Sequence, residues 1–161
     1  MPANVTLERV RSEVLEFLGE TFDRVRGIYL DRGTSFFETL ADVTASEASR
    51  RASPDTASIA AHVRHCIYYL EVLQRPLQGE PLGTLDWRSI WTNDRPVDEG
   101  EWDELRDRLR NEAASVEARA KDDATWERED SPWEFMAIIV HTAYHLGAVR
   151  QALRVIRAER V

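Results

Sequence analysis

The four histidines of the chain fall into two close pairs, His62 with His65 and His141 with His145. The pair members are three and four residues apart, and the sequence around both pairs has the apolar periodicity of an amphipathic helix. Each pair can therefore project two imidazoles from one helical face. Neutral imidazole is the commonest metal ligand, and three protein nitrogens with an open water position are usual at a catalytic zinc. If the two helices are neighbours, this pattern predicts a divalent-metal site.

The second pair lies in the stretch IIVHTAYHLGAV, which is otherwise nearly free of polar side chains. Burying two imidazoles there without partners would cost about 1–3 kcal/mol each, and a bound metal would satisfy them. The third nitrogen must come from the first pair, but the spacing does not choose between His62 and His65. The alternative interpretation is that the histidines are unrelated core or surface residues. Cys66 is more typical of a small buried hydrophobe than of a thiolate ligand.

The elements that must position these side chains are predicted to be helices. Apolar residues recur every three or four positions, and no convincing alternating strand pattern is present. The run from Leu7 to Leu40 is expected to form one long helix or two pieces, and further helices are expected over residues 59–74, 102–120 and 132–158. Four substantial helices with short to medium connections predict an all-α four-helix bundle, with residues 1–161 forming a single domain.

Local signals predict where these helices begin. Ser58 is expected to begin the second helix, and Ser131 is expected to cap the last one, with Pro132 at its first position. Residues 85–100 are expected to be irregular. This segment carries Trp87 and Trp91, which are available to cover an opening.

Composition argues against several classes of protein. The net charge of −8 argues against nucleic-acid partners, which need a basic face. No apolar stretch has the length of a transmembrane helix, and the first residues do not resemble a secretory signal. Cys66 is the only cysteine, which excludes an internal disulfide and is typical of a reducing cytoplasm. We therefore expect a cytoplasmic protein with no nucleic-acid or membrane partner.

The chain resembles the DinB-like, or YfiT-like, metalloenzyme family in two segments, SIAAHVRHCIYYLEVL and HTAYHLGAVRQAL. In that family a small or hydroxyl residue opens the second helix, a histidine follows seven positions later, and the fourth helix carries H-x-x-x-H. Here Ser58 is followed seven positions later by His65. The resemblance implies His65, His141 and His145 as the metal ligands. It makes His62 a neighbouring pocket residue or a hydrogen-bonding partner of the site.

The resemblance also suggests a function. It implies a bound divalent cation, zinc or nickel, although imidazole suits several first-row metals. Such a metal lowers the pKa of a bound water or thiol. Relatives include mycothiol-dependent isomerases and bacillithiol-type S-transferases, so a low-molecular-weight thiol is the expected substrate and thiol-dependent transfer or isomerisation the expected reaction. Two alternatives stay open: metal-dependent hydrolysis of a small amide or ester, and a non-catalytic stress-associated binding or scaffold protein.

The sequence identifies no general base. Glu71 and Glu134 are the only acidic residues close enough to the histidine pairs to be considered. Bundles of this family commonly pair through helix faces, so a homodimer is a further expectation. An apolar stripe on the first helical run would supply its interface, formed by Leu15, Phe17, Ile28 and Phe37.

Overall fold

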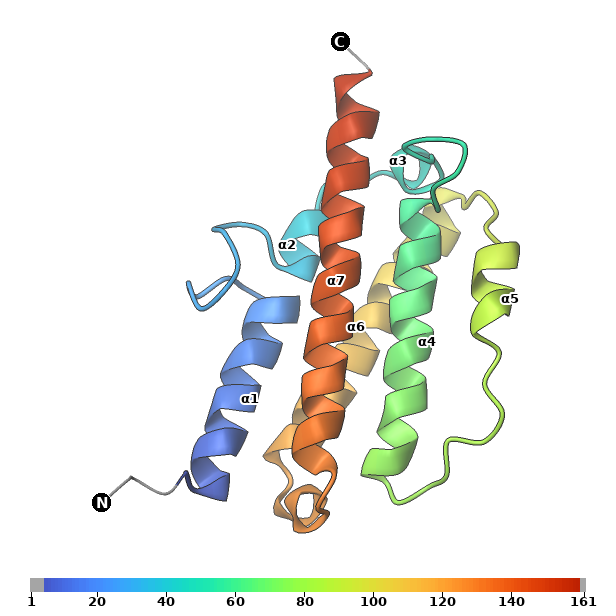
Figure 1. The fold of residues 1–161 in the computed structure, drawn as a ribbon. Coiled ribbons are helices and arrows are strands. Elements are labelled where there is room, and N and C mark those ends of the chain that lie inside the picture. Colours follow the sequence, from blue (N-terminus) through green and yellow to red (C-terminus); the bar gives the residue numbers. More distant parts are fainter. Residues whose placement is uncertain (1–4, 160–161) are drawn as a thin grey trace.

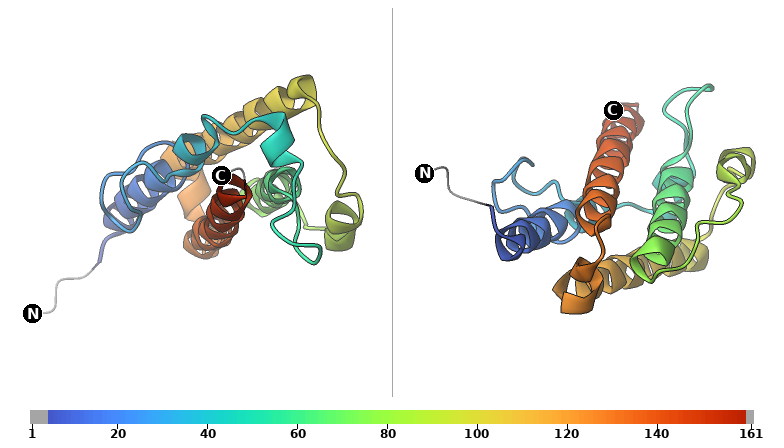
Figure 2. Two further views of the ribbon diagram at one scale, coloured as in Figure 1. Left: turned by 90° about the horizontal axis from the view of Figure 1, so that it is seen from above. Right: turned by 60° about the horizontal axis from the view of Figure 1, so that its bottom comes forward.

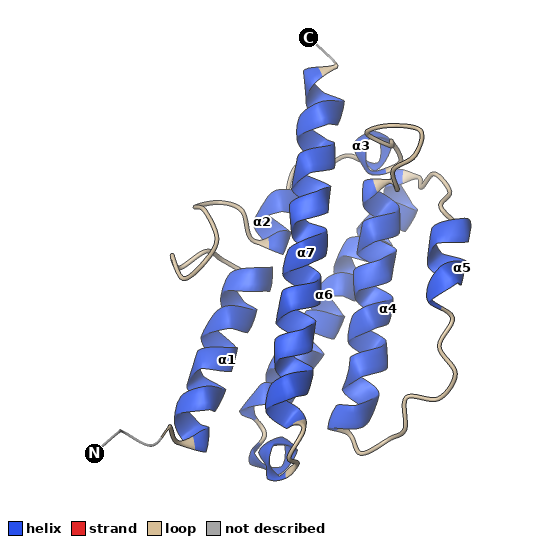
Figure 3. Cartoon of the chain, viewed as in Figure 1, coloured by secondary structure: helices blue, strands red, loops and turns tan. Residues whose placement is uncertain are grey.

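The structure, a computed structural model, describes residues 5–159 and is all-α within that range (Figures 1 and 3). Within the described residues no strand is present, and a single isolated β-bridge joins Arg51 and Ser58. The helices in chain order are α1 (Leu7–Phe22), α2 (Phe36–Leu40), α3 (Ala45–Ala48), α4 (Ile59–Leu77), α5 (Trp87–Thr92), α6 (Glu99–Lys121), the short 3-10 helix η1 (Asp123–Glu127) and α7 (Ser131–Ala158).

The four long helices surround the hydrophobic core. Helices α1, α7 and α4 lie side by side in that order and form one layer. Helix α6 packs against one side of this layer and contacts both α1 and α4 (Figures 1 and 2). Helices α4 and α7 run in opposite directions side by side. The largest fully buried side chains come from the long helices and from α2, and include Leu70, Trp102, Phe135 and Phe36. This core fixes the spacing of α4 and α7, the two helices that carry the histidines.

Side-chain caps mark the starts of α4 and α6. At α6, the Asp98 carboxylate accepts the backbone N–H of Glu101 at 2.8 Å. Ser58 begins α4 as expected, because its hydroxyl accepts the backbone N–H of Ala61 at 3.1 Å. Helix α7 differs in detail from the expectation. Ser131 is its first residue rather than its cap, and the Ser131 hydroxyl donates to the Thr125 carbonyl at 2.5 Å. The reason is that η1 brings this carbonyl against the start of α7.

The first apolar run forms separate pieces rather than one long helix. Helix α1 ends at Phe22, and a loop of residues 23–35 leads to α2. The buried Glu20 carboxylate accepts backbone N–H groups of this loop over 2.7–3.0 Å, from Arg26, Ile28, Tyr29 and Leu30. Gly27, at φ 88°, supplies the left-handed backbone that the turn requires. These bonds satisfy backbone donors that a continued helix would otherwise have used.

The segment expected to be irregular contains the short helix α5. Asp86 caps it by accepting the Ser89 backbone N–H at 3.1 Å, and α5 packs against α4. A two-turn helix carrying two tryptophans has too few residues to show a clear helical period, which explains the difference. No helix among residues 5–159 combines the length and the apolar character needed to cross a membrane.

Candidate metal centre

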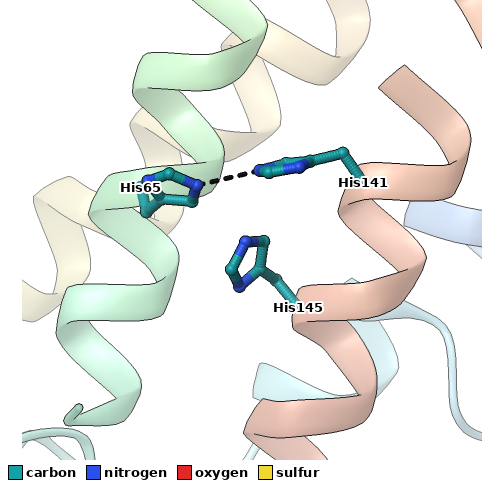
Figure 4. A group of neighbouring side chains, drawn as sticks. All are labelled: His65, His141 and His145. Atoms are coloured by element: carbon teal, nitrogen blue, oxygen red, sulfur yellow. Dashed lines mark hydrogen bonds between the residues drawn. The ribbon is translucent and has the colours of Figure 1, made fainter. Parts of the chain in front are cut away.

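The predicted ligands meet between the two central helices. His65 projects from α4, and His141 and His145 project from adjacent turns of α7 toward it (Figure 4). One ring nitrogen from each lies within 4.8 Å of the others, and the Nε2 atoms of His65 and His141 are 2.9 Å apart. Two nitrogens bound tetrahedrally to zinc lie about 3.4 Å apart. The three side chains therefore can hold a metal ion after small adjustments.

His62 lies at the edge of the same cluster. It sits one turn before His65 on α4, and its Nδ1 is 3.0 Å from Nδ1 of His145. Because α4 and α7 are antiparallel, His62 faces His145 while His65 faces His141. The structure thus brings all four histidines together. The group of three whose nitrogens converge is His65, His141 and His145.

The electrostatic surroundings favour neutral imidazoles. Burial, together with the neighbouring imidazoles, lowers the pKa of His65 to about 4 and that of His145 to about 3. Burial also lowers the pKa of His141 and of His62, and the charge of Asp94 partly opposes this for His62. All four rings are consequently uncharged near neutral pH. The neutral ring is the form that offers a lone pair to a metal.

The chemistry of the donor set fits a divalent metal. Three neutral nitrogens, one from each of His65, His141 and His145, converge between α4 and α7. At 2.9 Å, the facing Nε2 atoms of His65 and His141 can form one N–H···N hydrogen bond, or both can be unprotonated if their lone pairs are directed at a shared cation. A borderline metal such as zinc or nickel suits an all-imidazole set better than a hard cation such as magnesium does.

Aromatic rings enclose the histidines. Tyr69 stacks on His141 with ring centroids 3.6 Å apart and planes 11° apart. From α5, Trp91 lies 4.5 Å from the His65 ring and Trp87 lies 5.9 Å from it. The two tryptophans therefore cover His65 from the side of α5. Trp87 and Trp91 are four residues apart in the sequence, and this spacing is the only local signal that predicts both side chains on one face of a helix.

The other candidate residues have different surroundings. Cys66 is buried in the hydrophobic core, and burial raises the pKa of its thiol. Glu71 pairs with Arg108. Glu134 pairs with Arg128 at 3.4 Å, and it precedes His141 by seven residues, which is about 10 Å along the helix axis. Neither glutamate is therefore placed as a base at the histidine cluster.

Sequence reasoning missed Asp94, which holds the start of α4. Its carboxylate accepts the Ser58 hydroxyl at 2.5 Å and the Ser58 backbone N–H at 3.1 Å. Arg51 pairs with the same carboxylate at 3.0 Å. Asp94 is 36 residues from Ser58, so no local pattern could have revealed the contact. It fixes the helix end that carries His62 and His65.

Comparison with known proteins identifies the family of this chain. A model of the DinB superfamily matches residues 30–148, which is more than half of the chain and includes all four histidines. No curated protein and no solved structure matches significantly. The match begins after α1 and confirms the resemblance in the histidine-bearing segments. The chain belongs to the DinB superfamily.

Proposed function

We propose that this protein is a divalent-metal-dependent enzyme in which His65, His141 and His145 hold zinc or nickel. The observation that carries this proposal is the convergence of three neutral ring nitrogens within 4.8 Å between α4 and α7. Membership of the DinB superfamily supports it, because metal binding is characteristic of DinB-like proteins. Three protein ligands leave coordination positions for a substrate, as expected for a catalytic rather than a structural site.

The proposed reaction is thiol-dependent transfer or isomerisation. The metal, when bound, would lower the pKa of a coordinated low-molecular-weight thiol, so that the thiol loses its proton at neutral pH. In transfer, the sulfur would form a bond to an electrophilic carbon, the bond from that carbon to its leaving group would break, and the thiol proton would pass to solvent. The chain contributes the orientation of the three imidazoles and the cover of Trp87 and Trp91, which limits the access of water to His65.

The test compares activity with and without thiol. Protein reconstituted with zinc or nickel is assayed with a panel of small thiols and an electrophilic chromogenic acceptor, beside a His145→Ala variant. Thiol-dependent consumption of the acceptor that disappears in the variant supports the proposal. Ester or amide hydrolysis that is indifferent to thiol would favour the hydrolase instead. A metal whose removal unfolds an inactive protein would favour a binding or scaffold role.

We also propose that the four long helices form a DinB-like four-helix bundle and that the whole chain is a single cytoplasmic domain. The mutual packing of α1, α4, α6 and α7 supports the bundle. Residues 1–4 and 160–161 of the proposed domain lie outside the described residues. The net charge of −8 supports the absence of nucleic-acid partners.

We also propose a homodimer, but its interface is on α7 rather than on the apolar stripe expected from the sequence. Of the expected stripe, Leu15, Phe17 and Phe37 pack against the core, and Ile28 is exposed but lies in the loop between α1 and α2. Exposed apolar side chains lie instead along α7, at Trp133, Met136, Val140 and Tyr144. A groove of about 300 Å³ between α1 and α7 adjoins them. We propose that a second copy covers this face, which would remove an unusually apolar surface from water.

Light scattering of the purified protein tests the dimer. The wild type is expected to have the mass of two chains, and Val140→Glu is expected to have the mass of one. Arg88→Glu is the matched control, because Arg88 is exposed on α5 and does not line this groove, and the variant is expected to stay dimeric. A monomeric wild type would contradict the proposal.

A further inference from the structure

The two nitrogens of His145 have different surroundings. Nδ1 lies 3.0 Å from Nδ1 of His62. The other ring nitrogen, Nε2, faces the gap between His65 and His141 (Figure 4). A neutral imidazole carries one proton, so a ring that offers Nε2 to a metal must carry its proton on Nδ1. With Nε2 on a metal, the N–H donor of His145 would therefore lie against Nδ1 of His62.

The contact distance requires His62 to accept that proton. Two N–H donors facing each other at 3.0 Å would repel, so one of the two Nδ1 atoms must act as acceptor. When His145 donates, the acceptor is the Nδ1 lone pair of His62. Metal-bound histidines usually donate their second N–H to a carboxylate, a backbone carbonyl or water. Here the position is taken by another imidazole.

His62 is itself held in place. It lies in the first turn of α4, where its backbone N–H donates to the Ser58 carbonyl at 3.1 Å. The Trp91 ring meets the His62 ring edge-on at 5.5 Å. Asp94 fixes Ser58 and places a negative charge near His62, which favours the partial positive charge that an accepting ring acquires. The other two predicted ligands contact aromatic rings: His141 stacks on Tyr69, and His65 lies against Trp91 with the ring planes tilted by 32°.

We propose that His62 is a positioning residue: its Nδ1 accepts the Nδ1–H of His145 and so fixes the tautomer and orientation in which His145 offers Nε2 to the metal. This inference rests on the proposed metal site and adds a role for the fourth histidine. Removing such partners typically weakens metal binding about 10–100-fold. His62→Ala is therefore expected to weaken binding to that extent.

The experiment measures zinc affinity by competition with a chromogenic chelator in four proteins: wild type, His62→Ala, His62→Asn and Arg64→Ala. Asparagine places its amide oxygen close to the position of Nδ1, so it keeps the acceptor and is expected to restore most of the affinity. Arg64 is the matched control on α4, because its side chain donates to the Arg95 carbonyl instead of to a histidine. Its variant is expected to bind zinc as the wild type does.

Two spectroscopic readouts separate positioning from direct ligation. X-ray absorption of the zinc-loaded wild type and of His62→Asn is expected to show the same number of imidazole ligands. Nitrogen-15 NMR is expected to show the His145 proton on Nδ1. Unchanged zinc affinity in His62→Ala, or the loss of one imidazole ligand in His62→Asn, would overturn the inference alone. A wild type that binds neither zinc nor nickel would overturn the proposed function together with it.

Discussion

Trp91 touches three of the four histidine rings, which makes it a reporter of what binds there. Its ring centroid is 4.5 Å from His65, 5.5 Å from His62 and 5.9 Å from His145. A paramagnetic ion such as Ni²⁺ between those rings quenches a nearby indole efficiently. We expect nickel to quench the tryptophan fluorescence of the wild type. Because Trp87 also lies 5.9 Å from the His65 ring, Trp91→Phe is expected to remove part of that quenching, and the double variant Trp87→Phe/Trp91→Phe most of it.

Trp133 provides the control for this titration, because it is 68% exposed and lies on α7 two turns before His141. Trp133→Phe is expected to keep the quenching seen in the wild type. Equal quenching in the double variant Trp87→Phe/Trp91→Phe and in the wild type would place the bound nickel elsewhere.

Glu20 is the residue whose charge matters most for the fold. Burial raises the pKa of this carboxyl, but the backbone N–H groups that donate to it lower the pKa by more, to about 2. A carboxyl whose pKa is lowered by folding stabilises the protein above its ordinary pKa of 4.5. That contribution is lost as the pH falls from there toward 2.

Glu20→Gln is therefore expected to lower the free energy of unfolding by about 1–3 kcal/mol at pH 7. The difference from the wild type should shrink when urea unfolding is repeated at pH 3. Glu13→Gln is the control on the same helix, because the ion pair that Glu13 forms with Arg9 is exposed, and it should cost less than about 0.5 kcal/mol. A difference at Glu20 that does not depend on pH would contradict this account of the loop.

At the scale of elements, the sequence predicts the histidine-bearing helices well because their apolar period and the Ser58 cap are local signals. It predicts the connections less well. The break after α1 depends on a Glu20 carboxylate that bonds residues up to ten positions away. The start of α4 depends on Asp94, and the facing of His62 to His145 depends on how α4 and α7 pack. Such contacts are set by tertiary structure and leave no periodic trace in the sequence.

Mutation of the N-cap of α4 tests how much the Ser58–Asp94 contact stabilises the protein. The Ser58 side chain is buried and bonds both the Ala61 backbone N–H and Asp94, whereas Thr6 caps α1 in an exposed position. Ser58→Ala is expected to destabilise the protein by about 1–2 kcal/mol, and Thr6→Ala by less. Urea unfolding measures both. An equal or larger loss of unfolding free energy in Thr6→Ala would show that the contact between Ser58 and Asp94 does not stabilise the protein.

At the scale of the whole molecule, the packing of all four long helices on one core predicts that they unfold together. Far-ultraviolet circular dichroism reports all the helices. Tryptophan fluorescence reports particular places, among them Trp102, which is fully buried and donates to the Val43 carbonyl at 2.7 Å. We expect the two signals to give the same thermal midpoint. Separate transitions would contradict a single domain.

The proposed function depends on His65, His141 and His145 holding one metal ion. Elemental mass spectrometry of the purified protein tests it most directly, beside His65→Ala, His141→Ala and His145→Ala variants checked for helicity by circular dichroism. We expect about one zinc or nickel ion per wild-type chain, with loss of the metal and retention of helicity in each variant. A protein that takes up no metal on reconstitution, or variants that keep the metal content of the wild type, would contradict it.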